Sequence, residues 1–147
     1  MRCSTGDNKG ILFALKVFRR LSSTKRRERF LNESQFLKTC SHPAIMCVFD
    51  DGVYRAQNGD QYPFVIAEYL PSTLADVIRR KDVPMVQKVS LALDLVSALG
   101  YLDNLNQKVV HRDIKPQNIF VKGRSCVLGD FGLRRYWGKM TKGTERV

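Results

Sequence analysis

The stretch His111-Arg112-Asp113-Ile114-Lys115-Pro116-Gln117-Asn118, followed by Asp130-Phe131-Gly132, decides how this 147-residue chain is interpreted. Its two acidic residues, Asp113 and Asp130, stand 17 positions apart. Asn118 and Asp130 carry oxygen atoms of the kind that Mg²⁺ prefers as ligands. Asp113 can accept a proton from a hydroxyl group, and Lys115 can place a compact positive charge beside an anion. Each short string is common by itself, but the two strings together in this order are not.

In order and spacing, the two strings resemble the catalytic loop and the metal-binding motif of eukaryotic-type (Hanks-type) Ser/Thr protein kinases. The resemblance implies an α+β, protein kinase-like two-lobed fold, with ATP and Mg²⁺ or Mn²⁺ as cofactors. It makes Asp113 the acceptor of the substrate hydroxyl proton and Lys115 the charge beside the transferring phosphate. It makes Asn118 and Asp130 the metal ligands. Lys115 after Asp113, and Leu133 after the second string, are typical of kinases that act on Ser and Thr.

A second part of the family pattern lies upstream. An apolar run of strand length, residues 10–18, contains Lys16. The run resembles the kinase strand whose lysine holds the ATP phosphates, and the flexible stem of such a lysine needs a carboxylate to fix it. Glu33, 17 residues later on an expected helix, is the predicted partner, and Glu28 is the alternative. Glu33 and Leu37 lie one helical turn apart, so both should face the same side.

The nucleotide pocket is expected where an apolar, strand-like segment ends at Glu68. By resemblance this is the hinge between the lobes, where the backbone at Glu68 and Leu70 binds the adenine edge. Ala67 occupies the position that gates the space behind the adenine, and its small side chain predicts an open pocket there. The adenine ring itself should lie between Ala14 and Phe120.

Four further side chains match the stack that connects the two lobes in active kinases: Leu37, Val48, His111 and Phe131. The alternative is that they are ordinary core residues. Both interpretations predict burial, so burial alone does not separate them.

The remaining pattern predicts short elements around one long helix. A short helix over 72–80 has, in Thr73 and Asp76, the spacing of a capping box. A longer helix over 85–105 carries apolar residues on more than one side, which predicts burial on more than one side. Short strands are expected over 45–49, 109–110, 119–121 and 126–128.

We expect one domain over residues 1–147, with a partial N-lobe over 1–67, a hinge over 68–71 and a partial C-lobe over 72–147 that ends in the activation segment. Neither a Gly-x-Gly-x-x-Gly loop nor the Ala-Pro-Glu that follows the activation segment in the family occurs. The sequence therefore predicts a kinase domain truncated at both ends, with a shortened relative as the alternative. Apolar surface should be exposed where later helices of the family would pack.

Composition limits the other functions. With 44% hydrophobic residues the chain can build a core, and its net charge of +11 favours anionic partners in general. The cations are not interleaved with aromatic residues, so there is no strong signal for nucleic acid. The four cysteines form no Cys-x-x-Cys pair, which argues against zinc and favours a reducing, cytoplasmic location, with the nucleus not excluded. Lys88 and Asp94 interrupt the longest apolar segment, so no transmembrane segment is expected.

The leading hypothesis is a Ser/Thr protein kinase that acts on protein substrates. A pseudokinase or nucleotide-binding interaction module is the first alternative, and the presence of every expected catalytic residue argues against it. A small-molecule kinase of the choline or aminoglycoside type is the second, and the Ile114-Lys115-Pro116 step argues against that one. Arg112 suggests regulation by phosphorylation of the activation segment, with Thr141 as the expected acceptor and Thr144 as a structural residue.

Overall fold

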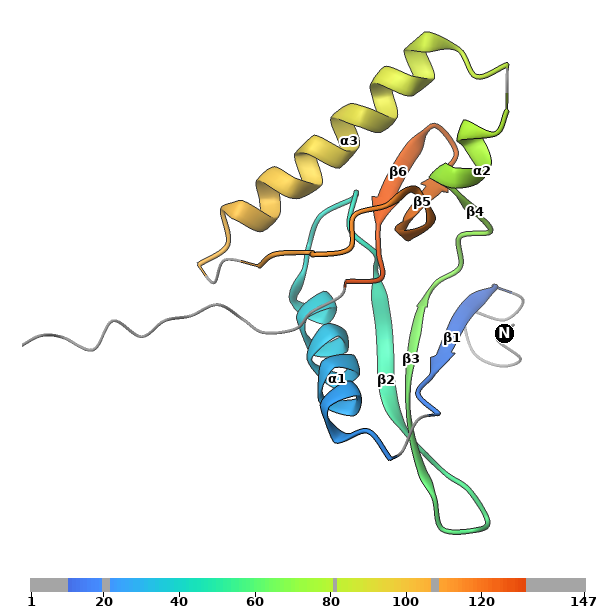
Figure 1. The fold of residues 1–147 in the computed structure, drawn as a ribbon, viewed down its shortest axis with the longest axis vertical. Helices are drawn as coiled ribbons and strands as arrows, with labels where there is room; N and C mark the ends of the chain where they lie inside the picture. Colours follow the sequence, from blue (N-terminus) through green and yellow to red (C-terminus); the bar gives the residue numbers. More distant parts are fainter. Residues whose placement is uncertain (1–10, 20–21, 81, 107–108, 132–147) are drawn as a thin grey trace, which may run out of the picture.

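The chain forms two antiparallel three-stranded sheets with helices on their flanks (Figure 1). The computed structural model describes residues 11–19, 22–80, 82–106 and 109–131. The first sheet has the order β1-β3-β2 and comprises β1 (Phe13–Val17), β2 (Val48–Arg55) and β3 (Gln61–Glu68), with helix α1 (Thr24–Thr39) beside it. The second has the order β4-β5-β6 and comprises β4 (Ser72–Thr73), β5 (Ile119–Lys122) and β6 (Ser125–Leu128). Its helices are α2 (Leu74–Ile78), α3 (Met85–Asp103) and the 3₁₀ turn η1 (Pro116–Asn118).

Strand β1 presents alternate side chains to one face of the first sheet. Ala14 and Lys16 share that face, because side chains two residues apart in a strand point the same way. Across the antiparallel ladder Ala14 pairs with Ala67 of β3, and Lys16 pairs with Val65. The register therefore places the lysine beside two small or medium apolar residues, on the side of the sheet where the pocket described below lies.

Helix α1 packs by one stripe of side chains. Phe30, Ser34 and Leu37 are buried and recur at the spacing of one helix face. The rings of Phe18, which directly follows β1, and Phe30 lie 5.6 Å apart and join the helix to the end of that strand. The helix ends at Thr39, before His42 and Pro43, as the sequence predicts.

Two predicted strands differ from the observed structure. The expected strand over 45–49 begins only at Val48, because the backbone before it pairs with β6 instead. The Met46 N–H donates to the Leu128 carbonyl at 2.9 Å, and the Leu128 N–H donates to the Ala44 carbonyl at 2.8 Å. This short segment thereby joins the two sheets. The prediction of a strand over 109–110 is wrong, since these residues form no ladder.

The short helix is also shorter than expected, because Ser72 and Thr73 pair with β5 as strand β4 before α2 begins. The capping box is confirmed. The backbone N–H and the hydroxyl of Thr73 both donate to Asp76 Oδ2 at 2.8 Å. The strands over 119–121 and 126–128 are confirmed as β5 and β6, and Gly123 between them adopts the left-handed region at φ +63°.

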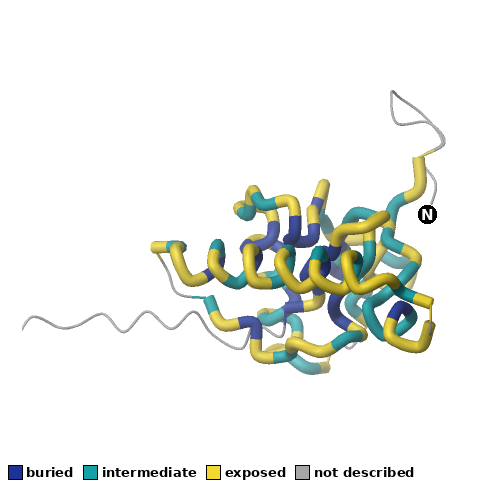
Figure 2. The backbone as a smooth tube through the Cα atoms, turned by 90° about the horizontal axis from the view of Figure 1, so that it is seen from above, coloured by how far each residue is buried: buried dark blue, intermediate teal, exposed yellow. Residues whose placement is uncertain are grey.

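Helix α3 buries one face and exposes another. Leu91, Ala98 and Leu102 are buried, and the helix lies against β6. Many residues along the length of α3 are exposed (Figure 2). The exposed apolar residues of this helix are Met85, Val86, Val89, Leu93 and Val96. The prediction of burial on more than one side is therefore wrong for the described residues, whereas the expected exposed apolar surface is present. By length and composition alone α3 could cross a membrane, which is weak evidence for a membrane span, and α3 packs against β6.

The buried and the exposed face of α3 predict different losses of stability for the same substitution of leucine by alanine. We expect Leu102→Ala to lower the free energy of unfolding by about 2–5 kcal/mol, because Leu102 is 2% exposed and its loss leaves a cavity. Leu93→Ala on the same helix is the matched control, and should change it by less than about 0.5 kcal/mol, because Leu93 is 63% exposed. Denaturant titration of the purified chain measures both. Equal costs would contradict the observed orientation of α3.

Candidate functional site

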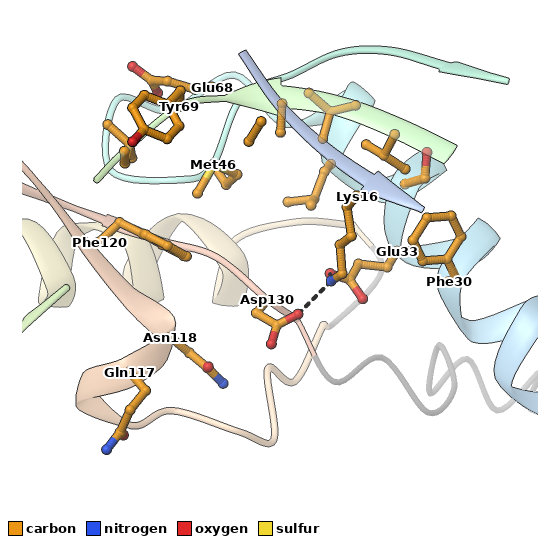
Figure 3. Close-up of a pocket in the computed structure, with 17 residues that line it drawn as sticks. Lys16, Phe30, Glu33, Met46, Glu68, Tyr69, Gln117, Asn118, Phe120 and Asp130 are labelled. Carbon is orange, nitrogen blue, oxygen red and sulfur yellow. Dashed lines mark hydrogen bonds and ion pairs between the residues drawn. The ribbon is translucent and has the colours of Figure 1, made fainter. Parts of the chain in front are cut away.

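A cavity of about 400 Å³ lies between the two sheets, bordered by β1, β3, α1 and the segments around β5 (Figure 3). Its size is within the usual range for small-molecule sites. Nine of the predicted site residues line it: Ala14, Lys16, Glu33, Ala67, Glu68, Leu70, Asn118, Phe120 and Asp130. Asp113 and Lys115 are not among the lining residues. The structure therefore brings residues from distant parts of the sequence to one cavity.

Three charged side chains meet inside this cavity (Figure 3). The Lys16 ammonium lies 2.6 Å from Asp130 Oδ1 and 3.5 Å from Glu33 Oε1. The expected pairing of Lys16 with Glu33 is thus present, and Asp130 lies closer still. Burial lowers the pKa of Lys16, but the two carboxylates outweigh this effect and raise it. Lys16 therefore stays cationic at neutral pH.

Glu33 is the titratable group that its surroundings change most clearly. Burial raises the pKa of Glu33 to about 7, and the negative charge of Asp130 contributes in the same direction. The Lys16 ammonium opposes both effects without cancelling them. Glu33 is therefore partly protonated near pH 7, and the strength of its pairing with Lys16 depends on pH.

The loop before β5 holds Asp113 in its charged form. Lys115 Nζ and Asn118 Nδ2 both donate to Asp113 Oδ2 at 2.8 Å. These two hydrogen bonds lower the pKa of the Asp113 carboxyl. Asn118 Nδ2 also donates to the Asp113 carbonyl at 2.9 Å, which closes the loop on itself. The result is an ionised, positioned carboxylate that can accept a hydrogen bond from a hydroxyl group.

His111 connects this loop to the segment that carries Asp130. It is buried, and its Nε2–H donates to the Gly129 carbonyl at 3.0 Å. The Asp113 N–H donates to His111 Nδ1 at 3.3 Å, a bond that requires an unprotonated Nδ1. Burial lowers the pKa of His111, in agreement with a neutral ring. The ring lies 4.3 Å from that of Phe131, so one histidine fixes both loops.

Backbone strain is concentrated at the same place. Among the described non-glycine residues, Arg112 at φ 65° and Asp130 at φ 52° occupy the left-handed region. Aspartate tolerates this region better than most residues, but arginine does not. Such conformations persist where the surrounding structure enforces them, and they are typical of functional sites.

The four predicted stack residues are all buried, and Leu37, Val48 and Phe131 belong to one core cluster. Phe36, which the sequence analysis did not single out, also packs on Phe131, with ring centroids 5.6 Å apart. Their burial agrees both with a stack that connects the lobes and with an ordinary core.

The donor set fits a hard divalent cation. Asp130 offers carboxylate oxygens, and the two hydrogen bonds described for Asn118 use its amide nitrogen and leave its carbonyl oxygen outside them. Within the described ranges no group of three or more His, Cys, Asp and Glu side chains could hold a metal. A Mg²⁺ ion held by these two residues would need phosphate and water oxygens as its remaining ligands, as Mg²⁺ usually has.

Sequence reasoning missed several lining residues: Phe30, Ser34, Met46, Tyr69 and Gln117. Tyr69 lies within the predicted hinge and Gln117 stands beside Asn118, but no pattern assigns any of the five to the cavity, which they enter through tertiary packing. It also missed Gly129, where a Cβ atom would lie 3.0 Å from both Met46 and Phe120. The absence of a side chain at this position lets Phe120 and Met46 approach the backbone that leads to Asp130.

A lysine and two carboxylates lie between two sheets, beside a loop that positions an ionised aspartate. This is the arrangement of a protein kinase domain. The protein kinase domain model matches residues 2–147, and the chain belongs to this family. The predicted Hanks-type kinase fold is thus confirmed.

Named relatives agree with this assignment. The chain is 30% identical over 120 residues to serine/threonine-protein kinase PknB of Mycobacterium leprae, an alignment that covers 80% of this chain and 19% of that protein. It is 32% identical over 111 residues to PknB of Mycolicibacterium smegmatis, covering 73% and 17%. Its identity to PknG of the same organism is 27% over 100 residues, covering 68% and 13%. The chain therefore spans about a fifth or less of the length of these relatives.

The neutral state of His111 predicts a pH effect on stability. Because its folded pKa is lower than the unfolded value, its contribution is present above about pH 6.5 and is lost as the pH falls through the folded pKa. We expect the free energy of unfolding to fall less steeply between pH 7 and 5 in His111→Gln than in the unsubstituted chain. Denaturant titrations at each pH measure the two slopes. Identical slopes would mean that His111 is not held neutral.

Proposed function

We propose that this chain is the nucleotide-binding and catalytic part of a Ser/Thr protein kinase, which transfers the γ-phosphoryl group of ATP to Ser and Thr hydroxyls of protein substrates. The observation that carries the proposal is the meeting of Lys16, Glu33 and Asp130 in one cavity. Phosphoryl transfer needs positioning and charge neutralisation more than covalent chemistry, and this cluster can supply both.

The adenine would occupy the end of the cavity at Glu68 and Leu70, between Ala14 and Phe120. The Glu68 N–H already donates to the Cys47 carbonyl at 3.0 Å. The Glu68 carbonyl is therefore the group of this residue that would accept a hydrogen bond from the adenine. The backbone N–H that donates to the adenine must belong to one of the next residues, and Leu70 is the expected one. The Glu68 side chain forms an ion pair with Lys122 of β5, which ties this end of the cavity to the second sheet.

The triphosphate would extend towards Lys16, whose ammonium can donate to phosphate oxygens while Glu33 fixes its stem. A Mg²⁺ or Mn²⁺ ion, held by Asn118 and Asp130, supplies neutralisation of the phosphate charge when bound. The substrate hydroxyl attacks the γ-phosphorus, the bond from that phosphorus to the β–γ bridging oxygen breaks, and ADP leaves. Asp113 takes the hydroxyl proton. The positive charge of Lys115 lies near the phosphoryl group while that group is transferred.

Two parts of the proposal concern the cell. Thr141 is proposed as a regulatory phosphorylation site, and it lies outside the described residues. A cytoplasmic location is supported by the described cysteines, Cys40, Cys47 and Cys126, all of which are free. A nucleotide-binding module without catalysis is the second candidate, and the ionised, well-positioned Asp113 argues against it.

Removing the proposed base should separate binding from catalysis. We expect Asp113→Ala to lower the rate of phosphoryl transfer from radiolabelled Mg·ATP to a mixed Ser/Thr substrate by about 10²–10⁴-fold, the usual contribution of a general base. Stabilisation by Mg·ATP in a thermal-shift assay should remain, because Asp113 does not line the cavity. Asp60→Ala, in the β2–β3 hairpin, is the control that should keep both. Transfer by Asp113→Ala at the unsubstituted rate would refute the assigned role.

The raised pKa of Glu33 predicts that nucleotide affinity depends on pH. Ionised Glu33 predominates above its pKa of about 7, and only that form holds Lys16 by charge. We therefore expect Mg·ADP to bind more tightly at pH 8 than at pH 6, by calorimetric titration. Glu33→Gln should reduce the difference between the two pH values, because the amide does not ionise. The same pH dependence in both proteins would assign the effect to another group.

A further inference from the structure

Lys122, the last residue of β5, does not line the cavity and has no part in the proposed chemistry. Its ammonium forms an ion pair with the carboxylate of Glu68, the last residue of β3, so the pair crosses from the second sheet to the first. The Lys122 side chain is 59% exposed, whereas that of Glu68 is 20% exposed. The loss of Lys122 would therefore leave a largely covered carboxylate with little water to replace its partner.

Three consecutive residues of β5 hold the connection between the two sheets. This connection leaves β3 at Glu68 and enters β4 at Ser72. Ser72 pairs with Val121 in the β4–β5 ladder, and Glu68 pairs with Lys122 through its side chain. Phe120, the third of the three residues, lines the cavity. The strand that supplies one wall of the cavity therefore also holds both ends of the connection.

Among the ion pairs of the described residues, two link the first sheet to the second sheet or to the segment after it. Lys16 of β1 contacts Asp130, just beyond β6, at 2.6 Å, and Lys122 contacts Glu68. Figure 3 shows Glu68 on one side of the cavity, away from the contact between Lys16 and Asp130. The Lys16 pair lies where the phosphates are proposed to bind, so a nucleotide would change it. The Lys122 pair lies where the base is proposed to bind and can stay intact.

A planar ring between two walls requires a fixed separation of those walls. The proposed adenine site lies between Ala14 on the first sheet and Phe120 on the second. A gap of about 0.5–1 Å beyond contact loses roughly a quarter to a half of the dispersion attraction between two atoms. A rotation of one sheet away from the other would therefore weaken the binding of the ring. The long, flexible side chain of Lys16 could still follow a phosphate group.

We propose that Lys122 is a positioning residue for adenine recognition, because its ion pair with Glu68 holds the two sheets at the separation at which Ala14 and Phe120 both contact the ring. The proposal rests on the nucleotide-binding function above, and it adds to that site a residue that does not touch the ligand. It predicts that Lys122 affects the binding of the base and not that of the phosphates. An ion pair that only stabilised the fold would affect both alike.

The test uses two ligands that divide the nucleotide. Adenosine carries the base without phosphates, and Mg·tripolyphosphate carries the phosphates without the base. The dissociation constant of adenosine is measured by ligand-detected ¹H NMR, and that of Mg·tripolyphosphate by calorimetric titration, both on the purified full chain. The midpoint of thermal unfolding is recorded for every protein.

The proteins differ in the charges at the two ends of the ion pair. Lys122→Gln removes the cation, and Lys122→Arg keeps it. The double variant Glu68→Lys/Lys122→Glu reverses the two charges. The matched control is Arg124→Gln, because Arg124 is an exposed cation between β5 and β6 that does not line the cavity.

We expect Lys122→Gln to raise the dissociation constant of adenosine by about three- to fivefold, the upper part of the range for one exposed ion pair. The dissociation constant of Mg·tripolyphosphate should change by less than about twofold, within the error of such an effect. Lys122→Arg and the double variant should recover adenosine binding, because both restore opposite charges at the two positions. Arg124→Gln should bind both ligands as the unsubstituted chain does.

The proposal is overturned if Lys122→Gln binds adenosine as tightly as the unsubstituted chain, or if it weakens both ligands equally. It is also overturned if neither Lys122→Arg nor the double variant recovers adenosine binding; if the double variant does not fold, Lys122→Arg alone decides. These outcomes leave the nucleotide function in place as long as Mg·ADP raises the unfolding midpoint of the unsubstituted chain. If neither Mg·ADP nor adenosine binds that chain, the nucleotide function and the role of Lys122 are both refuted.

Discussion

The contact between the Lys16 ammonium and the Asp130 carboxylate is the interaction on which the site depends. It joins a strand of the first sheet to a loop 114 residues later, at 2.6 Å. Both side chains are about half exposed, so the pair adds little to stability by itself. Its importance is electrostatic, because two carboxylates, Asp130 and Glu33, are held close together and would repel each other without the lysine between them.

That contact exists because backbone hydrogen bonds elsewhere set its geometry. Ala44 and Met46 bind both backbone groups of Leu128, and Asp130 follows Leu128 by two residues. Gly129 between them accepts from His111 and leaves no room for a side chain. Three contacts therefore fix the position of Asp130: the pairing of Leu128 with Ala44 and Met46, the hydrogen bond of Gly129 to His111, and the close packing against Gly129 at the cavity wall. The left-handed backbone of Asp130 is a consequence of these three constraints.

The sequence predicted the parts of the site that are local or that follow a family spacing. Asp113, Lys115 and Asn118 interact within one loop, so their order in the chain nearly determines their contacts. The sequence did not predict which apolar faces would be buried. Helix α3 has more apolar sides than the described structure buries, and periodicity alone cannot choose among them. The strand predicted over 45–49 fails for a related reason, because its first residues pair with β6, a long-range choice that no local pattern encodes. Ser34 is a polar residue in an unremarkable helical segment, and only the folded structure shows that its hydroxyl is buried.

The shared charges would also couple the two proposed ligands of the site, the nucleotide and the metal ion. A like charge brought near Glu33 raises its pKa further, whereas a cation lowers it. A triphosphate arriving alone would thus favour protonated Glu33 and weaken its hold on Lys16. A divalent cation beside Asp130 acts in the opposite direction, because it replaces the negative field of that carboxylate with a positive one. If the proposed function holds, the arrangement of one lysine between two carboxylates would therefore favour the joint binding of nucleotide and metal over the binding of nucleotide alone.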